Sequence, residues 1–159
     1  MEMLQDNDLG VRMNAVNAFG LYQQNPQATH ALLPLLDEQY RLLRPEVIMA
    51  LGTMKDPQAV PALVQVFGQE KDEETRVAIV NALGRIGGPQ ATEVLVKLSG
   101  DKSTQVRLAA VYGIAAAGSS DLAVLLEPFM KDRDKQVRES AQQILNRGKQ
   151  NPPGDYKRP

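Results

Sequence analysis

Apolar residues recur along most of the chain in two alternating sets, each with the spacing of one face of an α-helix. In the first set they stand at i, i+4, i+7 and i+8, and an arginine follows the first of them. This spacing places them along one side of a helix with 3.6 residues per turn. The arginines occupy positions 12, 44, 76, 107 and 138, so they lie 32, 32, 31 and 31 residues apart. Such regularity indicates a tandem repeat of about 31 residues.

The second apolar set lies between these segments and has its own helix-start signals. They are Asn25-Pro26, Asp56-Pro57, Gly88-Pro89 and Ser120-Asp121. Proline suits the first helical position because its missing N–H has no partner there. We predict nine helices, roughly over 9–22, 26–37, 43–54, 57–68, 73–86, 89–99, 104–117, 121–131 and 135–147. Pro34 and Pro128 lie deeper in their helices and should bend them.

Most helices of the first set also begin with a capping residue. Three positions before the first apolar residue stand Asp8, Asp72, Ser103 and Asp134. Their side chains are able to accept a hydrogen bond from an unpaired amide of the first turn. The second copy has Tyr40 at this position and Pro45 beside its arginine, so we expect its helix to begin late.

The repeat resembles HEAT repeats, in particular the short bacterial type related to phycobilisome-lyase repeats, whose second helix reads approximately Asp-x(5)-Val-Arg-x-x-Ala-x-x-Ala-Leu-Gly. Residues 6–20 and 101–115 match this pattern best, and the resemblance covers about residues 1–148. It implies an all-α fold, a right-handed α-α superhelix of about five repeats whose first repeat is incomplete at the N-terminus. We expect residues 149–159, which contain three prolines, to form a flexible tail.

An acidic residue stands six positions before each arginine of the repeat. The acids are Asp6, Glu38, Glu70, Asp101 and Asp132, and the arginines are Arg12, Arg44, Arg76, Arg107 and Arg138. The resemblance implies that these residues form a structural ladder between the turns of neighbouring repeats. Arginine can bond a carboxylate through two N–H groups and still reach free carbonyls. We therefore predict that the row stabilises the solenoid rather than binding phosphate or substrate.

Composition restricts the chemistry. The chain has no cysteine and one histidine, His30, so neither thiolate chemistry nor a histidine–cysteine metal cluster is expected, and we predict no cofactor. The serines have no plausible histidine and acid partners for nucleophilic catalysis. The formal charge of −1 and the confinement of the basic cluster to the end of the chain argue against a nucleic-acid groove. We expect no membrane span, because no apolar run is long enough, and the cytoplasm is the favoured compartment.

The exposed side of the first-set helices is the candidate binding surface. At position i+6 stand Asn17, Met49, Asn81, Tyr112 and Gln143, and at i+2 beside them stand Met13, Val77 and Leu108. Methionine and tyrosine offer adaptable contact area, and side-chain amides can bond the backbone of an extended peptide. A second interpretation stays open, in which the i+2 residues pack between neighbouring helices.

These features favour a non-catalytic scaffold that binds another protein or a peptide on its concave face. The resemblance implies two alternatives: a bilin lyase or chaperone for chromophore attachment to a phycobiliprotein, and a HEAT-like DNA-repair enzyme.

The two ends of the array are predicted to differ. The last helix carries Glu139, Ser140, Gln142, Gln143 and Asn146 and should form a polar cap. At the other end, Leu4, Val11, Val16 and Phe19 should form an uncovered apolar strip. We therefore expect either that the chain was cut from a longer solenoid with further repeats upstream, or that the N-terminal edge docks on a partner or self-associates.

Overall fold

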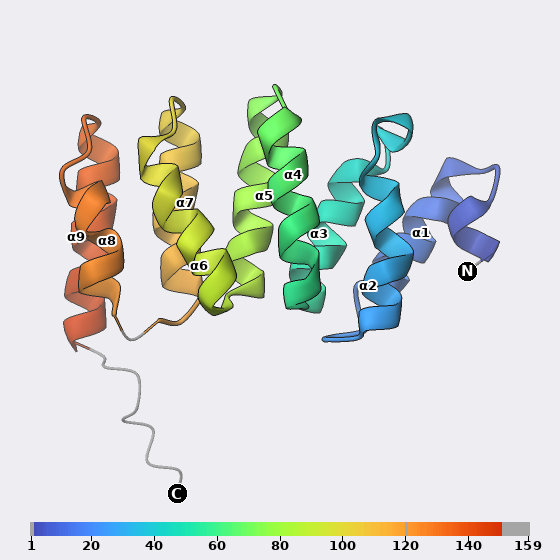
Figure 1. Ribbon diagram of the computed structural model, residues 1–159, viewed down its shortest axis with the longest axis horizontal. Helices are drawn as coiled ribbons and strands as arrows, with labels where there is room; N and C mark the ends of the chain where they lie inside the picture. The colour runs from blue at the N-terminus through green and yellow to red at the C-terminus, as the bar shows by residue number, and fades with distance from the viewer. Residues whose placement is uncertain (1, 120, 151–159) are drawn as a thin grey trace, which may run out of the picture.

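The computed structural model describes residues 2–119 and 121–150, and over these residues it is a row of stacked helices (Figure 1). Its α-helices are α1 (Leu9–Phe19), α2 (Pro26–Leu32), α3 (Arg44–Met54), α4 (Val60–Gln69), α5 (Glu73–Ile86), α6 (Gly88–Lys97), α7 (Thr104–Ala116), α8 (Leu122–Met130) and α9 (Lys135–Gln150). Short 3-10 helices are η1 (Glu2–Gln5), η2 (Leu33–Leu36), η3 (Glu38–Tyr40), η4 (Pro57–Ala59) and η5 (Leu98–Gly100).

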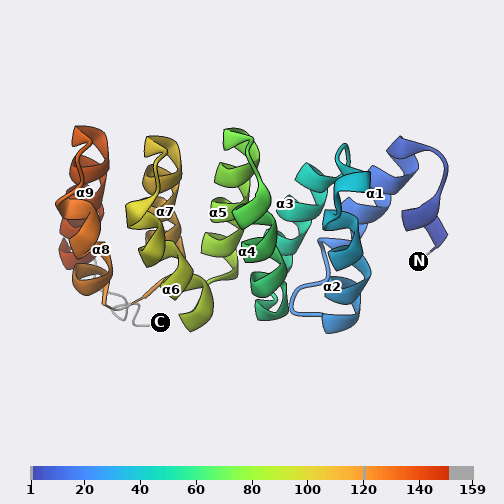
Figure 2. The same cartoon turned by 45° about the horizontal axis from the view of Figure 1, so that its top comes forward.

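The helices lie in two layers. The odd-numbered helices form one layer and the even-numbered helices form the other (Figures 1 and 2). Within the odd-numbered layer α3 packs closely on α5 and α5 on α7, whereas α4, α6 and α8 contact one another much less. A row of helix pairs curves toward the layer with the shorter spacing. The odd-numbered layer therefore forms the concave side of the solenoid.

The core lies between the two layers. Each even-numbered helix contributes one fully buried leucine, namely Leu32, Leu63, Leu95 and Leu126. The central odd-numbered helices α3, α5 and α7 bury their i+4 and i+8 residues against them, for example Ile79 and Leu83 of α5. Burial of one such side chain contributes about 1.5–3 kcal/mol relative to leaving it exposed. The apolar spacing that identified the repeat is therefore the spacing of the core.

The predicted starts of α1, α5 and α7 are confirmed. The Asp8, Asp72 and Ser103 side chains accept hydrogen bonds from the backbone N–H groups three residues later, at 3.0, 2.8 and 3.2 Å. Helix α3 begins at Arg44 without a side-chain cap. It has Pro45 in its first turn, where a missing N–H costs nothing.

Several helices are shorter than predicted, α1 and α2 most of all. Helix α1 ends at Phe19, and the following turn places Gln24 in the left-handed region, with a φ of 50°. There its backbone N–H donates to the Met54 carbonyl at 2.7 Å and joins the first repeat to the next. Helix α2 gives way to the 3-10 helix η2, which contains Pro34. A proline cannot donate the α-helical hydrogen bond to the fourth residue before it, and this loss accounts for the change.

Glycines allow the central concave helices to approach to backbone contact. A Cβ atom on Gly52 would stand 2.9 Å from the Ala82 Cα, and one on Gly84 would stand 2.6 Å from the Gly113 Cα. At the last interface, between α7 and α9, the equivalent positions hold Ala115 and Ile144. Residues of that size exclude an equally close approach.

The structure corrects two predictions about the ends of the array. Leu4 and Val16 are buried rather than uncovered, because η1 packs Leu4 against α1. Ser140 is also buried. It faces α7 instead of forming part of the polar outer face of α9, since it contacts Tyr112.

Within the described ranges, none of the helices has both the length and the apolar character needed to cross a membrane. Most of the tail predicted for residues 149–159 lies outside the described residues, and α9 continues to Gln150.

Candidate functional site

The predicted binding row runs across all five helices of the concave layer. Asn17, Met49, Asn81, Tyr112 and Gln143 lie on α1, α3, α5, α7 and α9, and all five are exposed. Met49 and Tyr112 are half-exposed, at 50% and 52%, and so offer apolar surface on this side. We call these five residues the concave row. It offers side-chain amides at Asn17, Asn81 and Gln143, and the adaptable side chains of Met49 and Tyr112 lie between them.

The three flanking residues contact the core. Met13, Val77 and Leu108 are partly buried and pack against the buried cluster. Each of these side chains therefore packs against the core, as the packing interpretation expects. Each also keeps some exposed surface, as the binding interpretation requires. Any ligand on the concave row would contact only the outer part of these side chains.

Tyr112 is held in place by the next repeat. Its hydroxyl lies 3.3 Å from the Ser140 Oγ, and either oxygen is able to donate. Ser140 is buried, so this contact fixes the phenol of α7 against α9 while one side of the ring stays exposed. Sequence reasoning missed this role of Ser140. A signal for it exists in the repeat alignment. Ser140 stands at i+3, and the residue at i+3 in the preceding repeat, Ala109, is small and buried.

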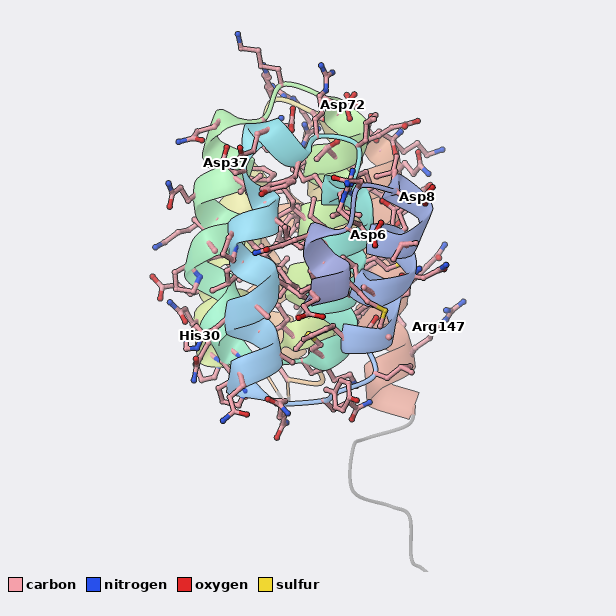
Figure 3. All side chains as sticks on the ribbon, turned by 90° about the vertical axis from the view of Figure 1, so that its right-hand side faces the viewer. Asp6, Asp8, His30, Asp37, Asp72 and Arg147 are labelled. Atoms are coloured by element: carbon pink, nitrogen blue, oxygen red, sulfur yellow. The ribbon has the colours of Figure 1, made fainter. Side chains whose placement is uncertain are left out.

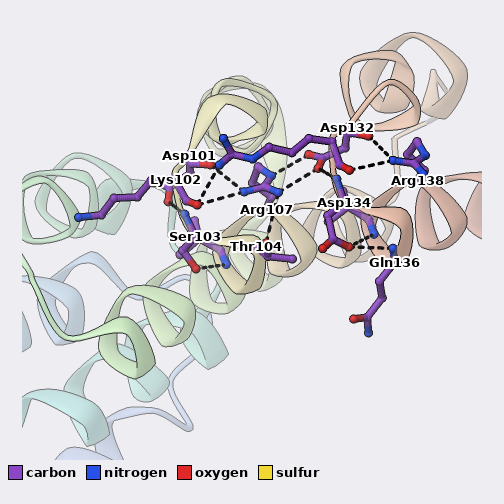
Figure 4. Close-up of polar contacts among 12 residues, drawn as sticks. Asp101, Lys102, Ser103, Thr104, Arg107, Asp132, Asp134, Gln136 and Arg138 are labelled. Atoms are coloured by element: carbon purple, nitrogen blue, oxygen red, sulfur yellow. Dashed lines mark hydrogen bonds and ion pairs between the residues drawn. The ribbon is translucent and has the colours of Figure 1, made fainter.

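The arginine ladder contains a deeply buried ion pair between the last two repeats (Figure 4). The Arg107 Nε and Nη2 atoms donate to the two Asp132 carboxylate oxygens at 2.7 and 2.9 Å. Their side chains are 2% and 4% exposed. The Nη1 atom of Arg107 donates to the Asp101 and Lys102 carbonyls at 3.0 and 3.3 Å. This one guanidinium therefore joins the turn of its own repeat to the turn of the next.

Two earlier rungs have the same direction. Arg44 pairs with Glu70 at 3.0 Å and Arg76 with Asp101 at 2.5 Å, so each acid binds the arginine of the preceding repeat. Arg76 also lies over the Phe67 ring, 4.4 Å from its centroid.

The arginines of the two terminal repeats bond backbone carbonyls. The Nη1 atoms of Arg12 and Arg138 donate to the carbonyls of Asp6 and Asp132, at 2.5 and 2.6 Å.

The buried rungs shift the pKa values of their carboxyls. Burial tends to raise the Asp132 pKa, but the hydrogen bonds from Arg107 and from the Asp134 backbone outweigh it, and the pKa is lowered. The hydrogen bond to Asp132 raises the Arg107 pKa. The Glu70 pKa is lowered, first by the hydrogen bond from the Asp72 backbone N–H and further by Arg44. All three groups are therefore held in their charged forms.

No catalytic constellation emerges among the described residues. His30 lies on α2, in the layer opposite the concave row (Figure 3). Within the same part of the chain, no group of three or more histidine, aspartate and glutamate side chains has an arrangement that would hold a metal ion. Arg147, the first of the basic residues near the end, lies on α9 at the far end of the array (Figure 3).

The two-layered array with an arginine rung between repeats defines an α-solenoid of the HEAT type. Accordingly, the family model for HEAT repeats matches residues 1–74, 31–105 and 65–146, in overlapping pairs of repeats. The chain belongs to the HEAT-repeat family.

Two similar curated proteins are bilin biosynthesis proteins PecE. The one from Mastigocladus laminosus is 30% identical over 148 residues, which cover 89% of this chain and 55% of the relative. The one from Nostoc sp. (strain PCC 7120 / SAG 25.82 / UTEX 2576) is 30% identical over 136 residues, covering 80% of this chain and 54% of the relative. The chain thus spans about half the length of these relatives.

Two solved structures share the fold. A chain in the complex of CpcE and CpcF of phycocyanin lyase from Nostoc sp. PCC7120 superposes with a TM-score of 0.66 at 24% identity, over 95% of this chain and 64% of that one. The crystal structure of an engineered protein superposes with a TM-score of 0.52 at 20% identity, over 91% of this chain and 75% of that one.

The relatives contradict the leading functional expectation. A non-catalytic scaffold was favoured by the sequence, but both PecE relatives are bilin biosynthesis proteins. The expectation failed because the repeat pattern reports packing, whereas function depends on surface residues that no motif marked.

Proposed function

We propose that this chain is a HEAT-repeat module of a bilin lyase, which assists the attachment of a bilin chromophore to a phycobiliprotein. The observation that carries the proposal is the 30% identity with PecE over 148 residues. This match extends over 89% of the chain and so includes surface as well as core positions. The fold shared with a chain of the phycocyanin lyase complex supports the same assignment.

The module acts together with a second protein. In the phycocyanin lyase complex CpcE is assembled with CpcF. This chain spans 55% of its PecE relative.

The concave row is the proposed contact surface for the chromophore or its carrier. A bilin is an open-chain tetrapyrrole with apolar rings, N–H and C=O groups, and carboxylate side chains. Met49 and Tyr112 would contact the rings, and Asn81 would bond the polar edge. Arg85 is exposed one helical turn beyond Asn81, on the same side of α5, where it would pair with a carboxylate.

The test is a chromophore-attachment assay. The purified chain is incubated with a bilin and an apo-phycobiliprotein subunit, with and without the CpcF subunit from Nostoc sp. PCC7120. Absorbance follows binding, and chromophore retained by the denatured subunit measures covalent attachment. We expect the chain to accelerate correct attachment.

A pair of variants locates the surface. Tyr112→Ala should slow attachment about tenfold, as expected for loss of an aromatic anchor contributing about 1–2 kcal/mol. Val124→Ala, at an exposed position of α8 in the other layer, is the matched control and should leave the rate unchanged. If the chain neither binds bilin nor alters attachment in any mixture, the lyase proposal is wrong.

A further inference from the structure

One carboxylate oxygen in the concave layer is buried without a partner. Glu46 stands in the first turn of α3, and its Oε2 atom has almost no contact with solvent and accepts no hydrogen bond from the described residues. Removing a carboxylate oxygen from water without supplying a donor costs free energy, so such atoms are rare in folded proteins. A donor from outside the chain would offset this cost.

Small residues occupy the equivalent position in the repeats that follow. The i+3 residues of α5, α7 and α9 are Ala78, Ala109 and Ser140, and the last two are buried. Side chains of this size fit between neighbouring helices. A glutamate is larger and carries a charge, so packing does not account for its presence at the same position of α3.

The repeat register sets Glu46 beside the concave row. At the last interface Ser140 at i+3 of α9 contacts Tyr112 at i+6 of α7. The same register between α1 and α3 sets Glu46 opposite Asn17, the first residue of the concave row. Glu46 also precedes Met49 by three residues, so these two side chains lie on the same side of α3. Part of the Glu46 side chain is exposed, and it therefore borders the surface proposed for the chromophore.

The arginines on the two helices of this interface are engaged elsewhere. Arg12 of α1 donates through Nη1 to two carbonyls of its own turn, and its Nε atom is itself buried without a partner. Arg44, which precedes Glu46 on α3, pairs with Glu70 at 3.0 Å. Within the described part of the chain, the Glu46 carboxylate thus has no direct counter-ion.

A ligand on the exposed side is able to reach this carboxylate. The terminal torsion of a glutamate is broad and roughly two-fold, so rotation about the Cγ–Cδ bond exchanges the two oxygens. Donors that carry positive charge form the strongest hydrogen bonds to a carboxylate. An open-chain tetrapyrrole has several pyrrole N–H groups, and it becomes a cation when a further pyrrole nitrogen takes up a proton.

We propose that Glu46 binds the pyrrole N–H groups of the bilin and holds the bound chromophore in its protonated form. The inference rests on the proposed function and adds to it a ligand-binding residue outside the concave row. It also accounts for the unpaired oxygen, because the ligand supplies the donor that the fold lacks. A binding group that lowers the stability of the free protein is a common compromise between stability and function.

The colour of the chromophore provides the test. Biliverdin, an open-chain tetrapyrrole, is titrated with the purified chain, and the absorbance of the bound pigment is followed as the pH is varied. Protonation shifts the long-wavelength band, so the pH midpoint of that shift measures how well the site stabilises the cation. Glu46→Gln should lower the midpoint by about one pH unit or more, because an opposite charge is lost beside the cation. It should also weaken biliverdin binding at neutral pH about tenfold.

Two further variants serve as controls for the spectroscopic test. Glu46→Asp keeps the charge and should retain most of the difference in pH midpoint. Glu127→Gln makes the same chemical change at an exposed position of α8, in the other layer, and should alter neither the affinity nor the midpoint.

The stability of the unliganded chain separates a binding role from a structural one. Glu46→Gln replaces an unpaired carboxylate by a neutral amide, so the melting temperature should stay the same or rise. Glu127→Gln should lower it slightly, since it breaks an ion pair with Lys131 at 2.8 Å. Circular dichroism follows both transitions.

Each outcome is decisive. An unliganded Glu46→Gln chain that melts below the parent shows that the carboxylate stabilises the fold, and this overturns the proposal. A Glu46→Gln chain that binds biliverdin with the affinity and the pH midpoint of the parent also overturns it, while the lyase proposal stands. A parent chain that binds no biliverdin overturns this inference together with the proposed contact surface, so the two failures are distinguishable.

Discussion

The central and C-terminal interfaces of the concave layer are held together in different ways. Between α5 and α7 the backbones meet at Gly84 and Gly113, and the rung from Arg76 to Asp101 has side chains that are 12% and 10% exposed. Between α7 and α9 no glycine pair permits such contact. There the rung from Arg107 to Asp132 is almost fully buried, and Tyr112 contacts Ser140.

This difference separates two sources of stability within one repeat pattern. Backbone contact at the centre depends on volume, so it should be sensitive to a single added methyl group and insensitive to pH. The C-terminal interface depends on a desolvated charge pair, so it should be sensitive to loss of either partner and to acid. The same repeat sequence thus accommodates a compact interface and a polar one.

The largest effect is expected for Arg107→Ala. This variant leaves the Asp132 carboxylate buried without its cation, which should destabilise the chain by about 3–5 kcal/mol. Urea unfolding followed by circular dichroism measures the change. Arg138→Ala is the control, since the Arg138 Nη1 atom donates to carbonyls of its own turn, and this substitution should cost about 1 kcal/mol. If the two variants lose the same free energy of unfolding, burial of the Arg107–Asp132 pair does not add to stability.

Gly84→Ala should destabilise the central interface by about 1–3 kcal/mol. The added methyl group would stand 2.6 Å from the Gly113 Cα, so α5 and α7 must separate, and overpacking of this kind usually costs that amount. Gly68→Ala is the matched control in α4, because its Cβ would meet nothing within 4 Å. It should instead stabilise the chain by about 0.5–1 kcal/mol through helix propensity. Stabilisation by both substitutions would disprove close packing as the role of Gly84.

Acid should weaken the C-terminal interface by protonating Asp132. The Asp132 pKa is lowered in the folded chain, so its contribution is complete above the unfolded pKa of about 3.9 and is lost as the pH falls through the folded pKa. The stability difference between the parent and Asp132→Asn should therefore shrink as the pH is lowered from about 5 to 2. The difference between the parent and Gly84→Ala should stay constant over the same range. If the free energies of unfolding of the parent, Asp132→Asn and Gly84→Ala change in parallel with pH, this assignment is wrong.

The smallest effect is expected for Tyr112→Phe. Removing the hydroxyl deletes its contact with Ser140. This contact is only partly buried and should contribute about 0.5 kcal/mol. The ring remains for any ligand on the concave row. Thermal unfolding measures the loss, and a cost similar to that of Gly84→Ala would mean that the hydroxyl has a larger structural role than its geometry indicates.

The repeat period and the helix starts were predictable because they depend on local chemistry. Asp8, Asp72 and Ser103 cap their helices through bonds that span three residues, and the apolar spacing requires only the geometry of one helix. The same reasoning failed where a contact joins distant residues. Ser140 was assigned to the polar end face, yet it meets Tyr112 from 28 residues away.

The concave row was predictable as a set of positions but not as a function. Helical periodicity places Asn17, Met49 and Asn81 on one side of their helices, and the structure leaves all three exposed. What such a row binds depends on the spacing and curvature of five helices, which no single repeat encodes. The bilin function was therefore only one of two alternatives implied by the repeat's resemblance, and the relatives, not the residues of the concave row, favoured it.

Local pattern alone determined the repeat, its caps, its apolar stripe and the position of one acid six residues before each arginine. Only the stacked array decided which arginine meets which acid, because each rung connects residues about one repeat apart, as Arg107 does with Asp132. It also decided that Ala18 is exposed whereas its equivalents Ala50 and Ala82 are buried, since the exposure of this position depends on which element packs against it. Side-chain identity sets what a position is able to bury, whereas burial itself is a property of two packed surfaces.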